Sequence, residues 1–155
     1  MIKLLERFMP LPTHHTLSAA GLNVLVVDDN IMTISIVKAM LEEMHFGRID
    51  SASNGRDGWD KISDNLEKGR PYDIVVMDWN MPEMNGYEAL RRCRDETRLN
   101  KMAIIMLSAE SQKRNILEAT KAGATSYIIK PLEKCEFNEK MKQVFAWIEK
   151  NRGAS

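Results

Sequence analysis

Five short strand-like runs alternate with longer amphipathic segments from Asn23 onward. The runs cover residues 24–27, 48–52, 74–77, 103–107 and 127–129. Apolar residues recur at helical spacing in segments 30–44, 55–68, 86–96, 111–122 and 133–150. Strands that alternate with helices form a parallel sheet with helices on both faces, joined by right-handed crossovers. We therefore expect an α/β fold with a doubly wound, five-stranded parallel sheet in the order 2-1-3-4-5 and five helices.

Length and charge limit the function classes that are open to the chain. Its 155 residues suit one compact domain, and Lys+Arg balance Asp+Glu at 22 each, so no bulk charge draws it to nucleic acid or anionic membrane. No apolar run approaches the ~20 residues that span a bilayer, and charges interrupt the apolar N-terminal stretch, which makes it a poor secretory signal. Cys93 and Cys135 lack metal-ligand spacing and are expected as free thiols. We expect a cytoplasmic monomer.

The first 21 residues differ from the rest of the chain. An amphipathic stretch runs into Pro10 and Pro12, and proline stops a helix. His14 and His15 follow, with no third metal ligand nearby. We expect residues 1–21 to form a flexible tail, with a partner-binding or self-docking helix as the alternative. Residues 22–150 would then form the domain and residues 151–155 a second tail.

Four of the five runs end in a polar side chain. Asp28 and Asp29 follow the first run, Asp78 the third, Ser108 the fourth and Lys130 the fifth. The carboxyl ends of parallel strands share one rim of the sheet, and strands 1 and 3 are neighbours in the expected order, so the three carboxylates should converge. Taken singly, each acid has a simpler explanation, as a helix cap for Asp28 and Asp29 or as a turn residue for Asp78.

The chemistry of this rim follows from its charges and spacing. Three clustered carboxylates repel one another unless a cation compensates, and oxygen ligands of this kind suit Mg²⁺. Neighbouring strands lie ~4.8 Å apart, so the short hydroxyl of Ser108 is one strand from Asp78. Lys130 lies two strands away, on the order of 10 Å, which calls for a long cationic side chain. The geometry favours a phosphoryl group on Asp78, with Mg²⁺ and Lys130 neutralising its charge.

Four motifs extend this pattern: VVDD at 26–29, DWNMPEMNG at 78–86, LSAE at 107–110 and AGATSYIIKP at 122–131. With these motifs in this order, the chain resembles response-regulator receiver domains, and most of all the single-domain receivers of chemotaxis. The similarity covers about residues 22–150 and agrees with a flavodoxin-like sheet. Two positions depart mildly from the commonest pattern: Ser108 stands where threonine is more usual, and Asn85 replaces an aspartate before Gly86.

The resemblance assigns a role to each acid of the rim. It makes Asp78 the phosphoacceptor. It implies that Asp29, Asp78 and the backbone carbonyl of Asn80 bind Mg²⁺, with Asp28 as an outer-shell residue. Asn80 and Glu110 are implied to be modulating positions.

The resemblance also implies a switch. Ser108 becomes the switch hydroxyl, Tyr127 the switch aromatic and Lys130 the phosphate-sensing cation. A half-buried core tyrosine is the simpler explanation for Tyr127. The family further implies a cis peptide bond before Pro131, and X-Pro bonds alone tolerate cis at low cost.

The leading functional hypothesis is a phosphorylation-driven signalling switch, not an enzyme. The chain would take phosphate from a histidine kinase onto Asp78 and change its affinity for a chemotaxis or flagellar-switch protein. Another two-component or phosphorelay pathway is the first alternative. An aspartyl-phosphate-forming phosphohydrolase is disfavoured because Asn80 stands where the general acid would be. A nucleotide or flavin binder is disfavoured because no glycine-rich loop follows the first run.

The resemblance places the partner surface on segment 111–122, the last strand and segment 133–150. We expect an amphipathic peptide of the partner to dock there, on a mixed surface typical of transient binding. Its apolar part would be Ala122 and residues beside Ile128. Its charged residues would be Lys113, Glu118, Lys121, Glu133 and Lys134.

Overall fold

A computed structural model of the chain describes residues 17–109 and 113–153. Five parallel strands form one sheet in the order β2-β1-β3-β4-β5, which confirms the expected flavodoxin-like α/β fold. The strands are β1 (Asn23–Val27), β2 (Arg48–Ala52), β3 (Ile74–Asp78), β4 (Ala103–Ser108) and β5 (Ser126–Ile129). The α-helices are α2 (Ile31–Glu43), α3 (Gly55–Glu67), α4 (Gly86–Asp95), α5 (Lys113–Lys121) and α6 (Lys134–Gly153). Two 3₁₀ turns, η1 (Ala19–Gly21) and η2 (Thr97–Leu99), complete the described elements.

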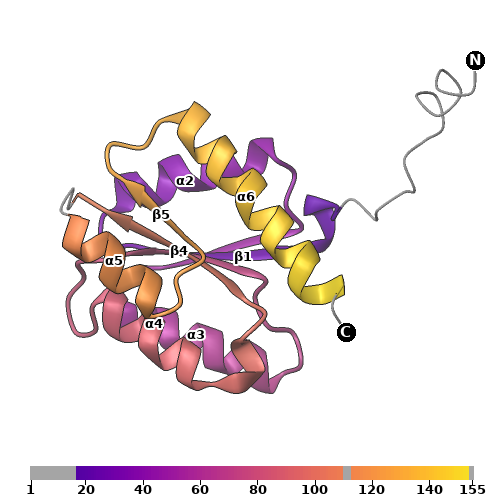
Figure 1. The fold of residues 1–155 in the computed structure, drawn as a ribbon, viewed down its shortest axis with the longest axis horizontal. Coiled ribbons are helices and arrows are strands. Elements are labelled where there is room, and N and C mark those ends of the chain that lie inside the picture. The colour runs from indigo at the N-terminus through magenta and orange to yellow at the C-terminus, as the bar shows by residue number, and fades with distance from the viewer. Residues whose placement is uncertain (1–16, 110–112, 154–155) are drawn as a thin grey trace, which may run out of the picture.

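The helices cover both faces of the sheet. Helices α2 and α6 pack on one face, and α3, α4 and α5 lie on the other (Figure 1). Side chains of a strand alternate between the two layers: Leu25 and Val27 join one core, whereas Val24 and Val26 join the other. Every residue of β3 and β4 is buried. Sheets buried on both faces read as continuous apolar runs, which is why these strands were evident in the sequence.

Three asparagines begin the helices that follow β1, β2 and β3. Each side chain accepts a hydrogen bond from a backbone N–H two or three residues later, as a good N-cap does. The capping residues are Asn30, Asn54 and Asn85. The cap of α2 is therefore Asn30, so the alternative interpretation of Asp28 and Asp29 as helix caps is wrong.

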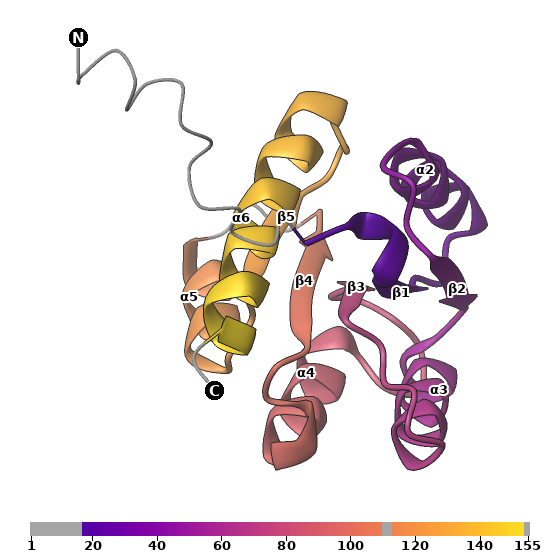
Figure 2. The ribbon, with the colours of Figure 1, turned by 90° about the vertical axis from the view of Figure 1, so that its right-hand side faces the viewer.

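Residues 17–21 contact the domain. The backbone N–H of Leu17 donates to Oε1 of Glu149 on α6 at 3.0 Å, and the Leu17 side chain packs against the core between α2, α6 and the sheet. The η1 turn lies between α6 and α2 (Figure 2), where the carbonyl of Ala19 accepts from Gly47 N at 3.2 Å. Residues 17–21 of the expected tail thus pack against the domain, whereas its residues 1–16 lie outside the described residues and their flexibility stays a prediction. At the other end, α6 includes residues 151–153.

Two further expectations concern cysteines and membranes. Cys93 is buried, Cys135 is exposed, and both are free thiols. Among the described residues, no helix has the length and apolar character that crossing a bilayer requires.

The backbone conformation of His45, at the end of α2, leads to a prediction about stability. His45 follows the C-cap Met44 and has a φ of 62°, a left-handed conformation that costs a non-glycine residue about 1–2 kcal/mol. The His45 side chain is exposed. We expect His45→Gly to raise the free energy of unfolding by about 0.5–1 kcal/mol in urea titrations. The matched control is Glu42→Gly, inside the same helix, which should lower it by about 1 kcal/mol. Destabilisation by His45→Gly would contradict the observed helix end.

Candidate functional site

The three carboxylates of the sequence motifs meet at one rim of the sheet. Val27 of β1 lies opposite Met77 of β3, so Asp28 and Asp78, each one residue further on, end neighbouring strands at the same level. Asp28 is fully buried and Asp78 is 6% exposed, whereas Asp29 faces solvent. One carboxylate oxygen from each aspartate lies within 4.8 Å of those from the other two. The expected convergence of the acids is therefore observed.

Lys130 joins two of these acids. Its Nζ lies 3.1 Å from Oδ2 of Asp28 and 3.2 Å from Oδ1 of Asp78. Lys130 follows β5, two strands from β3 and three from β1 in the sheet order. Its long side chain, 23% exposed, is what allows one ammonium to reach both carboxylates. The contact with Asp28 was not part of the sequence expectation, which paired Lys130 with Asp78 alone.

The carboxylates of Asp28 and Asp29 lie in different surroundings. Oδ1 of Asp28 accepts a hydrogen bond from the backbone N–H of Asn30 at 2.8 Å, while Oδ2 accepts from Lys130. Both oxygens of this buried group are thus engaged by the protein. Asp29, the next residue, is exposed. Of the two, Asp29 is the carboxylate that an ion from solvent reaches directly.

Opposing effects of burial and charge set the pKa values of Asp78 and Lys130. The pKa of Asp78 is raised to about 6, because burial and then the charge of Asp28 raise it by more than Lys130 lowers it. Burial lowers the pKa of Lys130, but its hydrogen bonds and the charges of Asp28 and Asp78 outweigh burial, so the net pKa is raised. Three carboxyl groups thus share one ammonium at the rim, an environment that favours additional positive charge.

The loop after β3 is held close to the strand ends. Trp79 N donates to the carbonyl of Leu107 at 2.8 Å, and Gly86 N donates to the carbonyl of Trp79 at 2.8 Å. A Cβ on Gly86 would lie 2.0 Å from the carbonyl oxygen of Asp78, so only glycine allows α4 to begin this close to β3. Asn80 belongs to this loop, two residues after Asp78.

Ser108 and Tyr127 lie on the next two strands. Ser108 is fully buried at the end of β4, one residue beyond Leu107, the partner of Asp78. Lys130 N donates to the Ser108 carbonyl at 2.8 Å. Tyr127 is half-buried on β5, and its ring centroid is 6.4 Å from that of Trp79.

The remaining site expectations have different outcomes. The peptide bond between Lys130 and Pro131 is cis, as the resemblance implied. Glu110 lies outside the described residues. Sequence reasoning missed Tyr87 of α4, whose ring centroid lies 5.3 Å from that of Trp79. It follows Gly86 at an ordinary helical position, and spacing within one helix carries no signal for a ring contact with a neighbouring loop.

The expected partner surface is altered at two positions. Ile128 is fully buried and contributes nothing to a surface. Lys134 pairs with Glu43 of α2 at 2.6 Å, so its charge is directed away from α5. Leu117 of α5 is 53% exposed, and Lys121, at the end of α5, is exposed. The side chain of Lys113 lies outside the described part of the structure.

The donor set at the rim fits Mg²⁺. Three carboxylates within reach of one another offer only hard oxygen ligands, and Mg²⁺ uses one or two carboxylates together with waters. Asp29, Asp78 and the carbonyl of Asn80 are the groups that could bind it directly, whereas both oxygens of Asp28 already have partners.

Known proteins resemble the chain along most of its length. The family model described as "Response regulator receiver domain" matches residues 24–142. The chain is 32% identical to chemotaxis protein CheY1 of Helicobacter pylori (strain ATCC 700392 / 26695), covering 79% of this chain and 96% of the relative. It is 34% identical to the chemotaxis protein CheY homolog of Campylobacter jejuni, covering 79% and 92%.

Solved structures resemble the fold in the same way. Chemotaxis response regulator CheY4 of Vibrio cholerae aligns with a TM-score of 0.70 at 27% identity, covering 80% of this chain and 98% of that one. A CheX–CheY–BeF3–Mg²⁺ complex from Borrelia burgdorferi aligns with a TM-score of 0.72 at 27% identity, covering 80% and 89%.

The crowding of the acids predicts how stability depends on pH in the absence of divalent cations. The folded-state pKa of Asp78 is raised from 3.8 to about 6. Between these values the folded state holds a proton that the unfolded state releases, so stability falls as pH rises through this window. Asp78→Asn should therefore raise the free energy of unfolding at pH 7.5 in EDTA by roughly 1–3 kcal/mol, with the gain shrinking towards pH 4.

Urea titrations of wild type and variant across this pH range provide the measurement. Asp95→Asn, which removes an exposed acid from α4, is the control and should change little. A variant at Asp78 that is less stable than wild type at pH 7.5 would contradict the electrostatics described here.

Proposed function

The chain belongs to the response regulator receiver domain family, and we propose that it takes a phosphoryl group from a histidine kinase onto Asp78 and thereby changes its affinity for a protein partner. The observation that carries the proposal is the pair of contacts that Lys130 makes with Asp28 and Asp78 at 3.1 and 3.2 Å. The ammonium lies where phosphoryl oxygens on Asp78 would need a cation. The protein acts as a signalling protein in the cytoplasm, not as an enzyme.

Each residue of the rim has a part in the transfer. A carboxylate oxygen of Asp78, ionised above a pKa of about 6, forms a bond to phosphorus as the bond from phosphorus to the donor nitrogen breaks. Lys130 then neutralises charge on the phosphoryl oxygens. Asp29, Asp78 and the Asn80 carbonyl would hold Mg²⁺, which would supply positive charge to the phosphoryl oxygens. Asp28 holds the Lys130 ammonium in place through their contact at 3.1 Å.

The switch begins at Ser108. Its hydroxyl lies at the end of β4, next to β3, and in the phosphorylated protein it donates to a phosphoryl oxygen. Such a bond contributes about 1 kcal/mol net, enough to shift the balance between existing conformations and too little to create a new fold. Tyr127 lies opposite Met106 of β4, so its ring responds when the end of β4 moves. Asn80 and Glu110 are the proposed modulating positions.

The output surface comprises α5, β5 and α6. It presents the exposed Leu117 and Lys121 of α5, the helix that contacts β5, and this mixed character suits transient binding. The relatives named above are chemotaxis proteins, which supports a partner in chemotaxis or in the flagellar switch. Another two-component pathway is the second candidate, because the rim residues are independent of what binds the output surface.

One prediction of this proposal concerns the phosphoacceptor. Incubation with acetyl phosphate and Mg²⁺ should add one hydroxylamine-labile phosphoryl group to each chain. Asp78→Asn should abolish it, because it removes the proposed acceptor carboxylate beside the Lys130 cation. Intact mass spectrometry measures the product. Asp95→Asn is the matched control and should be labelled like wild type. Labelling that persists in Asp78→Asn would overturn the assignment.

Another prediction of this proposal concerns the Mg²⁺ ion. Trp79 follows Asp78 directly, so its fluorescence should change when Mg²⁺ binds. Asp29→Asn should weaken the measured Mg²⁺ affinity by about tenfold or more, because it removes a direct charged ligand. Asp57→Asn, which removes an exposed acid from α3, should leave the affinity unchanged. Equal Mg²⁺ affinity in wild type and Asp29→Asn would contradict the ligand set.

A further inference from the structure

A cleft with an apolar lining lies between the end of α2 and α6. It has a volume of about 280 Å³. Pockets that hold small molecules usually exceed about 300 Å³, so this cleft has the size for a few apolar side chains of a chain segment. Its apolar lining residues are Met44, Met141 and Phe145, and its polar lining residues are Glu43, Asn138 and Lys142.

Leu17 lies at one end of this cleft. Its N–H donates to Oε1 of Glu149 at 3.0 Å. Glu149 follows Phe145 by four residues, so the two side chains are neighbours on one side of α6. The side chains of Leu17, Met44 and Phe145 also pack against the same core. The residues before Leu17 therefore join the domain about one helical turn from the cleft lining.

The length of the cleft can be compared with the reach of these residues. Lys134 forms an ion pair with Glu43 across α6 and α2, one turn beyond Asn138 and away from Leu17. The 11 residues from Asn138 to Glu149 rise about 17 Å along α6. Extended chain rises about 3.1 Å per residue, so the seven residues 10–16 cover about 22 Å. Residues 4–9 can therefore reach any part of the cleft.

The sequence of the N-terminal segment suits an apolar cleft. Leu4, Leu5 and Phe8 recur at the spacing of one helical face, and Lys3 and Arg7 fall on the opposite face. A helix of this length is marginal by itself in water. Its apolar face therefore needs a surface to pack against.

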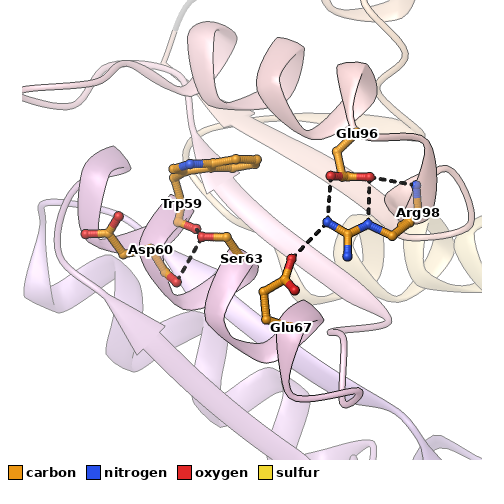
Figure 3. Close-up of polar contacts among 6 residues, drawn as sticks. All are labelled: Trp59, Asp60, Ser63, Glu67, Glu96 and Arg98. Carbon is orange, nitrogen blue, oxygen red and sulfur yellow. Dashed lines mark hydrogen bonds and ion pairs between the residues drawn. The ribbon is translucent and has the colours of Figure 1, made fainter.

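Polar side chains on the α3 side of the domain already have partners. Figure 3 shows Glu67 of α3 and Glu96, the residue before η2, in contact with the guanidinium of Arg98 at 2.9 and 3.0 Å. The hydroxyl of Ser63 donates to the carbonyl of Trp59 in its own helix. These groups are satisfied within the domain, whereas the cleft between α2 and α6 has open volume beside apolar side chains.

We propose that residues 1–16 dock onto their own domain and place Leu4, Leu5 and Phe8 in the cleft between α2 and α6. This is the self-docking alternative to the flexible tail expected from the sequence. The tether favours this occupant, because a short linker gives a local concentration on the order of mM, so a contact that is weak between separate molecules is occupied within one chain. Docking does not require phosphorylation of Asp78, since no rim residue lines the cleft.

Backbone order parameters of the full chain, from ¹⁵N relaxation, provide the first measurement. In wild type the amides of residues 3–8 should have S² of about 0.85, and Leu5→Ser/Phe8→Ser should lower it below about 0.6. Lys3→Gln/Arg7→Gln, on the opposite face of the segment, is the matched control and should leave S² unchanged. Leu5→Ser/Phe8→Ser should also shift the amide signals of the cleft residues Met44, Lys142 and Phe145, although none of these is substituted.

A nitroxide label then locates the segment. Cys135 is exposed and Cys93 is buried, so a thiol reagent labels Cys135, next to Lys134 at the far end of the cleft. The nitroxide should broaden the amide signals of residues 4–9 in its own chain, and Leu5→Ser/Phe8→Ser should reduce that broadening several-fold. A mixture of ¹⁵N-labelled chain without nitroxide and unlabelled chain with nitroxide should show no broadening.

Three results would overturn the proposal. The first is an S² below about 0.6 for residues 3–8 in wild type, which describes a flexible chain. The second is an ordered segment whose substitution at Leu5 and Phe8 leaves the signals of Met44, Lys142 and Phe145 unshifted, since the segment then packs elsewhere. The third is broadening in the mixture, since the occupant of the cleft is then the segment of a second copy.

Discussion

The contact of one ammonium with two buried carboxylates determines how the rest of the rim is arranged. Lys130 lies 3.1 Å from Asp28 and 3.2 Å from Asp78, and these acids end adjacent strands. Leaving either buried carboxylate without its cation typically costs several kcal/mol. The parallel sheet order, which brings the ends of β1, β3 and β5 to one rim, is what makes a single shared cation possible.

The same arrangement gives the site its reactivity. Burial and the charge of Asp28 keep the pKa of Asp78 raised although Lys130 lowers it, so the site remains crowded by negative charge. Added positive charge relieves that imbalance. A phosphoryl group on Asp78 would bring further negative charge, which Lys130 and a bound cation would neutralise. Asp28, held by Asn30 N and Lys130, fixes the lysine without competing for the position that Asp29 offers to a metal ion.

Much of the fold and of the rim could be predicted from the sequence, because the topology of a doubly wound sheet determines which strand ends are neighbours. The positions of Asp28, Asp78, Ser108 and Lys130 follow from where the apolar runs stop. The sequence could not show which oxygen Lys130 contacts, since this depends on the rotamer of a long side chain. Helical spacing alone also places Ile31 among apolar residues, yet it is exposed. Which face a helix turns to the sheet depends on packing with both neighbouring layers.

The central claim is that Lys130 limits the electrostatic cost of two buried acids. Carboxyl ¹³C NMR titration of Asp78, in wild type and in Lys130→Met without divalent cations, tests it most directly. The account predicts a pKa near 6 in wild type and a higher value in the variant, because the attraction that lowers the pKa is removed while burial and Asp28 remain. A pKa near the ordinary value of about 4 in both proteins would contradict it.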